Sequence, residues 1–88
     1  MTDQTITVGE LRDIAASVAA AIDPGGESAA ARMLVEASRA ADDPEGLLEV
    51  RSALIETRPV WERFVDGALR ARAHRALAAA KRLAIELD

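Results

Sequence analysis

Residues 59–87 read PVWERFVDGALRARAHRALAAAKRLAIEL, and this stretch decides the fold that we expect. It has no proline after Pro59 and a single glycine, Gly67, which predicts one continuous helix of about 29 residues and ~43 Å at 1.5 Å per residue. A glycine in a helix interior costs roughly 1 kcal/mol relative to alanine, so Gly67 is the point at which this helix would bend or break.

The predicted long helix has separate apolar and basic faces. On the apolar face, intervals of 4, 3, 4, 3 and 4 residues separate Leu69, Ala73, Ala76, Ala80, Leu83 and Leu87. This is heptad-like spacing, and its central alanines would let a neighbouring helix approach closely. A second arc of the same helix carries basic side chains: Arg63, Arg70, His74 and Lys81.

Three shorter helices are expected before it, over residues 7–22, 27–41 and 44–57. Thr7 and Glu10 have the spacing of a capping box at the start of the first. The sequence Asp23-Pro24-Gly25-Gly26 ends that helix. Asp43 before Pro44 is the N-terminal signal of the third helix, and Pro59 restricts the residue before it, which predicts a boundary near residue 57.

The apolar positions of these segments recur at helical spacing and predict the core. They are Val8, Leu11, Ile14, Ala15, Val18 and Ile22, then Ala30, Met33, Leu34, Ala37 and Ala41, then Leu47, Leu48, Val50, Leu54 and Ile55. Trp61 and Phe64 are expected to close this core from the start of the last helix. With 20 alanines and no alternating strand pattern, the chain is predicted to be a single all-α domain, residues 1–88, a small bundle of three short helices and one long C-terminal helix.

Charge is distributed unevenly along the 88 residues, whose net charge is −4. Residues 1–57 carry 11 acidic and 4 basic side chains, a balance of −7, whereas residues 58–88 carry 4 acidic and 7 basic ones, a balance of +3. The two parts are therefore expected to attract one another. The overall negative charge disfavours nonspecific binding to nucleic acid.

Several function classes lose their chemical basis in this composition. The chain has no cysteine, and His74, its single histidine, lacks neighbouring metal ligands, so we expect no metal site, no cofactor and an exposed histidine. No serine has an activating base in the local sequence. No apolar run approaches the ~18 residues of a membrane span and no leader pattern opens the chain, so neither a membrane nor secretion is expected and the cytoplasm is the expected location.

Two features of the sequence resemble known families. Gly26-Glu27-Ser28 at a helix start resembles the phosphopantetheine site of acyl carrier proteins, but it covers three residues and departs from their Asp-Ser-Leu triplet; Ser28 is better interpreted as a helix cap. The clustered arginines are similar to those of the small all-helical chorismate mutases, whose long helix comes first and not last. That resemblance implies an alternative function, a small helical enzyme or binding protein that holds an anionic substrate.

The function that the sequence favours is protein–protein interaction, as an adaptor, inhibitor or assembly factor. A ~43 Å helix would extend beyond its shorter neighbours and leave its apolar face for a second copy, which predicts a homodimer. The predicted contact residues are Leu69, Ala73, Ala76, Ala80, Leu83 and Leu87, flanked by Arg70, Arg75 and Arg82. These arginines also predict a protein partner with an acidic surface.

Overall fold

Four helices follow one another along residues 6–87, the part of the chain that the computed structural model describes; the side chain of Leu87 lies outside this description. They are α1 (Val8–Ile22), α2 (Ala29–Arg39), α3 (Pro44–Phe64) and α4 (Gly67–Leu87). Nothing in this range is a strand, so the predicted all-α class is confirmed.

The first three helices begin at the caps that the sequence predicted. In α1 the Glu10 amide donates to Thr7 Oγ1 (3.2 Å) and the Thr7 amide donates to Glu10 Oε1 (3.3 Å), which completes the capping box. Ser28 Oγ accepts from the Ala31 amide at the start of α2. Asp43 caps α3, with Pro44 in its first turn.

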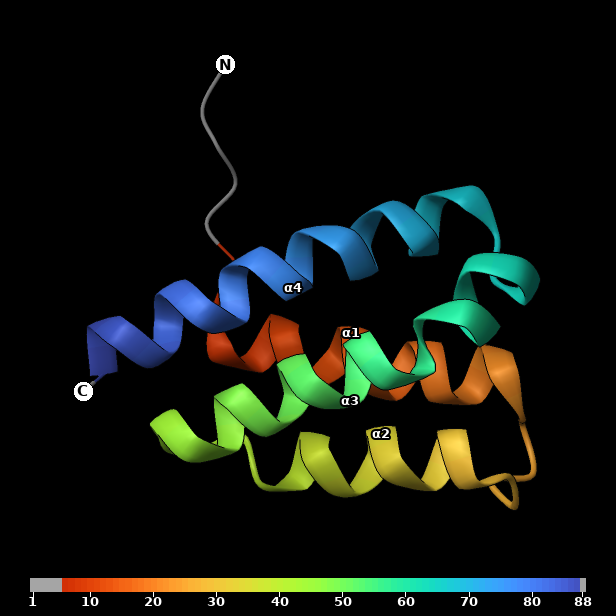
Figure 1. Cartoon of the computed structure of the whole chain (residues 1–88), viewed down its shortest axis with the longest axis horizontal. Helices are drawn as coiled ribbons and strands as arrows, with labels where there is room; N and C mark the ends of the chain where they lie inside the picture. Colours follow the sequence, from red (N-terminus) through yellow and green to blue (C-terminus); the bar gives the residue numbers. More distant parts are fainter. Residues whose placement is uncertain (1–5, 88) are drawn as a thin grey trace.

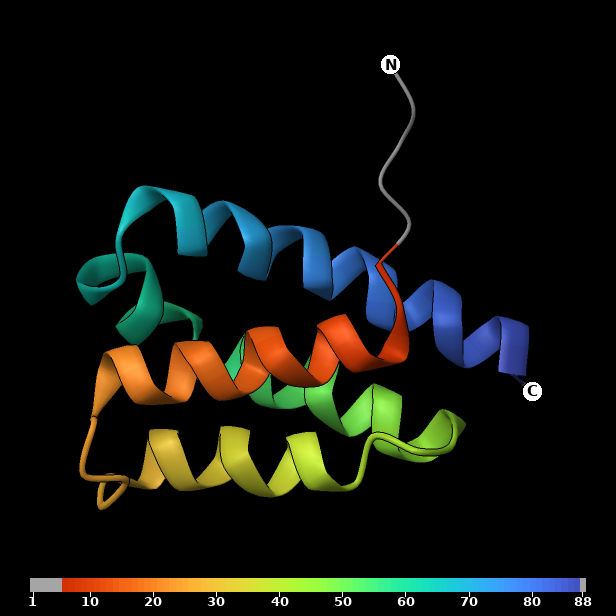
Figure 2. The ribbon, with the colours of Figure 1, turned by 180° about the vertical axis from the view of Figure 1, so that it is seen from behind.

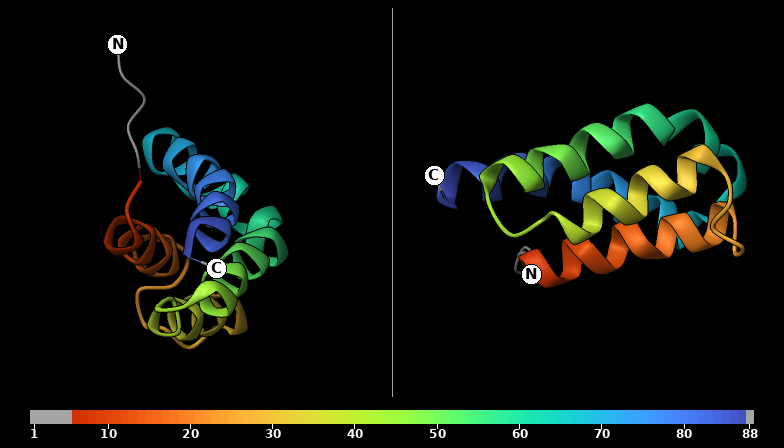
Figure 3. Two further views of the ribbon diagram at one scale, coloured as in Figure 1. Left: turned by 90° about the vertical axis from the view of Figure 1, so that its left-hand side faces the viewer. Right: turned by 90° about the horizontal axis from the view of Figure 1, so that it is seen from below.

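Helices α1 and α3 form the middle of the bundle, and α2 and α4 lie on its two sides. Both α2 and α4 contact α1 and α3 but not each other within the described range, and consecutive helices run in opposite directions (Figures 1 and 2). Seen end on, the four helices enclose one common interior (Figure 3). The largest fully buried side chains are Trp61, Leu11, Ile14, Leu34, Leu47, Leu54, Val18 and Val50.

Some apolar side chains that were expected inside lie on the surface instead. Phe64 is 70% exposed, Leu48 44%, Ile55 43% and Met33 38%. The expectation that Phe64 closes the core is therefore wrong, whereas Trp61 is fully buried as expected. Phe64 is the last residue of α3, and the chain leaves the helix there before the next turn could cover it.

Helix α3 continues through Pro59, so the boundary predicted near residue 57 is wrong. Proline has no amide to donate to the carbonyl one turn earlier, that of Ile55. Both Pro59 and Ile55 are exposed, so the missing hydrogen bond is on the water-facing side of the helix. On the inner side, Trp61 Nε1 donates to the Leu54 carbonyl at 2.9 Å. Burial of Trp61 therefore holds the turn after Pro59 in helical geometry.

The predicted helix over residues 59–87 is also wrong, because the chain leaves helical geometry between Phe64 and Gly67. Val65 is extended (φ −96°, ψ 143°) and 5% exposed, so its side chain is buried in the core. Asp66 then caps α4: its Oδ1 accepts from the Leu69 amide at 2.9 Å. The break thus falls beside Gly67, the point at which the sequence suggested weakness.

This break removes the length mismatch on which the predicted association depended. Helices α3 and α4 have 21 residues each and lie antiparallel (Figure 1). Because α1 contacts α4 as well, α4 is covered from two sides by its own chain.

Candidate functional site

The apolar face of α4 that was predicted to bind a second copy lies inside the protein. Four of its members are buried, Ala73, Ala76 and Ala80 at 0% exposure and Leu83 at 9%, and Leu69 packs half-buried against the core. The side chain of the sixth member, Leu87, falls outside the described residues. This face therefore cannot be a docking surface in the folded chain: small alanines let α4 approach α1 and α3, and the heptad-like spacing reflects that internal packing.

The three arginines that flank this face differ in their exposure to solvent. Arg70 is half-buried, and its Nη1 donates to the Glu62 carbonyl at 2.8 Å, which ties the start of α4 to the end of α3. Arg75 and Arg82 are exposed. Arg82 Nε lies 3.8 Å from Glu86 Oε2, a surface pair of little energetic weight.

Among residues 6–87, the two hollows that arginines line also contain a glutamate. Arg72 and Arg75 line a hollow of only about 40 Å³ together with Glu10, whose carboxylate would repel an anion. Arg58 and Arg63 line a shallow hollow of about 550 Å³, but Glu62 lies between them. The arrangement therefore gives no support to the binding of an anionic substrate.

Glu62 is the centre of a polar cluster where α3 meets α4. The hydrogen bond from Arg58 lowers the pKa of the Glu62 carboxyl, and the charges of His74 and Arg70 act in the same direction. His74 is exposed, with its Nε2 3.8 Å from Glu62 Oε2 and its ring edge-on to the buried Trp61 at 5.0 Å between centroids.

The predicted attraction between the acidic and basic parts is not made by direct ion pairs. Within residues 6–87, Arg12 pairs with Asp42 inside the acidic part. The other pairs, Arg58–Glu62, His74–Glu62 and Arg82–Glu86, all lie inside the basic part. Among the described residues, each part thus keeps charged side chains at the surface that form no ion pair.

The loop between α1 and α2 is ordered by Asp23. Its carboxylate accepts from the amides of Gly25 (3.1 Å), Glu27 (3.0 Å) and Ser28 (2.7 Å), and these bonds, that from Ser28 first, lower the pKa of Asp23. Gly26 adopts φ +69°, which glycine tolerates. Because Ser28 Oγ accepts the Ala31 amide, this serine acts as the predicted helix cap.

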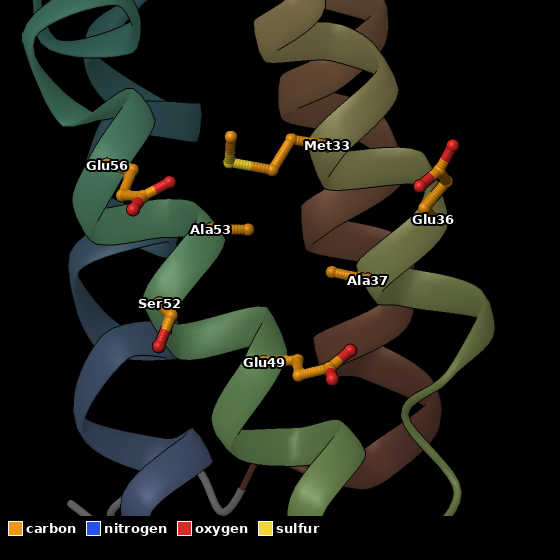
Figure 4. A pocket seen from close by; sticks show the side chains of 7 residues that line it. All are labelled: Met33, Glu36, Ala37, Glu49, Ser52, Ala53 and Glu56. Atoms are coloured by element: carbon orange, nitrogen blue, oxygen red, sulfur yellow. The ribbon is translucent and has the colours of Figure 1, made fainter.

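An open groove between α2 and α3 combines apolar and acidic side chains. It has a volume of about 430 Å³, and Figure 4 shows Met33 and Glu49 projecting from the two helices into the space between them. Its lining residues are Met33, Glu36, Ala37, Glu49, Ser52, Ala53 and Glu56. The three carboxylates have no ion-pair partner among the described residues, and no basic side chain lines the groove.

The sequence did not reveal this groove. Met33 was expected inside the core, and the outward glutamates belong to two separate helices whose relative placement no local pattern encodes. The only signal was that the apolar face of α2 is narrow, so that a long side chain at its edge reaches the surface. The groove offers three carboxylates, a thioether and one hydroxyl as groups that a ligand could contact.

Two other kinds of site have no counterpart in residues 6–87. There, no three histidine, aspartate or glutamate side chains come together in a way that could hold a metal ion. Nor does any of the four helices have the length and hydropathy needed to traverse a bilayer. Comparisons with protein-family models, with curated proteins and with solved structures gave no match for this chain.

Proposed function

We propose that this chain is a small helical protein–protein interaction module whose docking surface is the groove between α2 and α3. The observation that carries the proposal is that the exposed apolar side chain of Met33 and three carboxylates without an ion-pair partner among the described residues line one hollow of about 430 Å³. Such a hollow accepts the apolar and cationic side chains of one helix face, the mode in which an amphipathic helix lies in a groove.

The exposed apolar surface of the groove and its carboxylates both support binding of a partner. Met33 is 38% exposed, and an unbranched thioether adjusts its shape to the side chains it meets. Glu36, Glu49 and Glu56 have no cation within ion-pair distance in the described chain, so a basic partner would add electrostatic complementarity without breaking an internal pair.

The same proposal places the module among regulators, inhibitors or assembly factors of a bacterium or bacteriophage, acting in the cytoplasm. Its support is compositional: ten of eleven basic residues are arginine, alanine is abundant and cysteine is missing. Such proteins need only a surface that a partner can bind, and the groove is the surface that we assign to this role.

Charge reversal in the groove tests this function. We expect the immobilised protein to retain a protein from a lysate of its native host that the Glu49→Arg variant fails to retain. The matched control is Asp13→Arg, which makes the same change of charge on the exposed side of α1, away from the groove. Titration calorimetry with the purified partner should then show binding weakened about tenfold or more by Glu49→Arg alone.

Two outcomes would refute the groove as the docking surface. In one, Glu49→Arg retains the same proteins as the unmodified chain with the same affinity. In the other, Asp13→Arg weakens binding as much as Glu49→Arg, which would make the effect one of net charge.

A further inference from the structure

The outer side of α4 carries a second regular stripe, opposite the buried one. Intervals of 4, 3, 4 and 3 residues separate its members, which are Ala71, Arg75, Ala78, Arg82 and Ile85. All five are exposed, and Ile85 is 68% exposed, the second most exposed large apolar side chain of the described chain. At 3.6 residues per turn these positions share one helix face, which we call the outer face of α4.

We propose that the groove between α2 and α3 binds the outer face of α4 of a second copy of this chain. The inference rests on the proposed function, since it takes the groove as the docking surface, and it commits the groove to one occupant. It also returns self-association to the C-terminal helix, on the face opposite to the one that the sequence indicated.

Charge spacing is the first argument for this occupant. Glu49 and Glu56 lie seven residues apart on α3, and Arg75 and Arg82 lie seven residues apart on α4. Seven residues are about two turns, ~10.5 Å at 1.5 Å per residue, so each charged pair has the same repeat along its helix. Two antiparallel or parallel helices can therefore bring both arginines opposite both glutamates at once.

Apolar complementarity is the second argument. Ile85 on α4 and Met33 beside the groove are both incompletely buried in one copy, and contact between them would remove apolar surface of each from water. Ala71 and Ala78, between the charged positions of α4, have no bulk that would hold the helix away from Ala37 and Ala53 on the groove floor.

This contact is heterologous, because the surface that one copy contributes differs from the surface that the other contributes. Because α2 and α4 flank the central pair α1 and α3 without touching each other, the groove and the outer face of α4 belong to different sides of one protomer (Figure 3). A copy that receives α4 in its groove still offers its own α4 to another copy. Association should therefore continue beyond the dimer, as a closed ring or an open chain, and depend on protein concentration.

Sedimentation velocity on the full chain tests the inference. We expect the average mass to rise over about a hundredfold range of protein concentration and the rise to weaken in about 0.5 M salt, because exposed charges attract less when screened. Glu49→Arg damages the groove and Arg75→Glu damages the outer face of α4, and each alone should weaken association about tenfold.

Mixing these two variants gives the decisive measurement. Glu49→Arg keeps an intact α4 and Arg75→Glu keeps an intact groove, so the equimolar mixture should associate at a total protein concentration at which neither variant associates alone. The charge-matched controls are Asp13→Arg and Lys81→Glu; Lys81 is exposed on α4 but lies off its outer face. Both controls should associate as the unmodified chain does.

Three results would overturn the inference. The unmodified chain could remain a monomer at every concentration and salt level, both variants could associate normally, or the mixture could stay monomeric. In the first case, retention of a host protein by the unmodified chain and not by Glu49→Arg would leave the proposed function in place, with a different occupant in the groove.

Discussion

At the scale of single residues, Gly46 is the glycine with the least room for a side chain. A Cβ at this position would lie 1.5 Å from the carbonyl oxygen of Ala40 and 2.5 Å from its carbon, and both are backbone atoms that cannot rotate away. We expect Gly46→Ala to lower the free energy of unfolding by about 3 kcal/mol, at the upper end of the overpacking range, in urea titrations followed by circular dichroism.

Gly9→Ala is the control for this substitution. A Cβ on Gly9 would meet nothing nearer than Thr7 Oγ1 at 3.9 Å, and Gly9 lies in the first turn of α1. Alanine there should raise the free energy of unfolding by roughly 0.5 kcal/mol through its better helix propensity. Equal effects of the two substitutions would contradict the close approach of α3 to residue 40.

The two aromatic residues should contribute very unequally to stability. Trp61 is fully buried and its indole donates to the Leu54 carbonyl, whereas Phe64 is 70% exposed. Trp61→Ala is expected to cost about 4 kcal/mol, because it leaves a large cavity and removes the hydrogen bond of the indole. Phe64→Ala should stay within about 0.5 kcal/mol. Thermal and urea unfolding would measure both changes in stability. A large loss of stability with Phe64→Ala would show that the Phe64 ring is buried.

Helix caps are the residues whose roles the sequence predicted best. The side chains of Thr7, Ser28 and Asp43 each accept a hydrogen bond from the amide three positions ahead, so the signal and its partner lie within the same short stretch. The surface positions of Met33 and Phe64 could not be predicted in this way. Their exposure depends on which neighbouring helix stops short of them, and that information is distributed over the whole chain.

At the scale of helices, Pro59 interrupts the hydrogen-bond ladder of α3 without ending the helix. Because Pro59 is exposed, its replacement should restore the missing hydrogen bond at no packing cost. We expect Pro59→Ala to raise the free energy of unfolding by about 1–2 kcal/mol, less than the full helix penalty of proline because the unfolded chain gains freedom.

Pro44→Ala provides the comparison, since Pro44 lies in the first turn of α3, where its missing amide has no helical partner. It should leave stability unchanged or lower it slightly. If Pro59→Ala also failed to stabilise, α3 would have to be kept in its present geometry by the proline itself, contrary to the role assigned to Trp61. Differential scanning calorimetry of the three proteins gives the answer.

The predicted boundary between the last two helices was wrong for an identifiable reason. Pro59 is a strong local signal that tertiary packing overrides, and Asp66 is an N-cap that resembles any other polar residue inside a long amphipathic stretch. Composition and periodicity were sufficient to predict that the chain forms four helices and which residues cap the first three. They were insufficient for the turn at Val65, whose extended backbone is stabilised by burial of its own side chain.

At the scale of the whole molecule, the groove between α2 and α3 also depends on how helices are placed relative to one another, which local sequence patterns do not encode. The groove exists because α2 and α3 lie side by side with Ala37 and Ala53 between them, and small residues keep the space open. The buried stripe of α4 looked like a docking surface only while that helix was thought to outreach its neighbours. Helical periodicity identifies an apolar face, but the covering of that face depends on where the chain turns back.

Stability of the folded chain should fall in acid through two carboxylates. Asp23 and Glu62 have pKa values below their ordinary 3.8 and 4.5, the first through bonds from backbone amides and the second chiefly through Arg58. A lowered folded-state pKa stabilises the protein fully above the unfolded value, where both states are ionised. As pH falls below about 4.5, the unfolded chain binds protons first, and the contribution is lost through the folded-state pKa.

Replacing Asp23 and Glu62 by their neutral amides shows how much of the acid-induced loss of stability comes from these two carboxylates. Asp23→Asn and Glu62→Gln should each reduce stability at pH 7 and flatten its decline between pH 5 and pH 3, because the replaced group no longer takes up a proton on unfolding. Urea titrations at several pH values measure the slope directly. Asp13→Asn is the control, since the Asp13 carboxylate makes none of the described hydrogen bonds. A decline as steep in both variants as in the unmodified chain would show that the acid sensitivity arises elsewhere, and would remove the loop at Asp23 and the α3–α4 junction at Glu62 as its source.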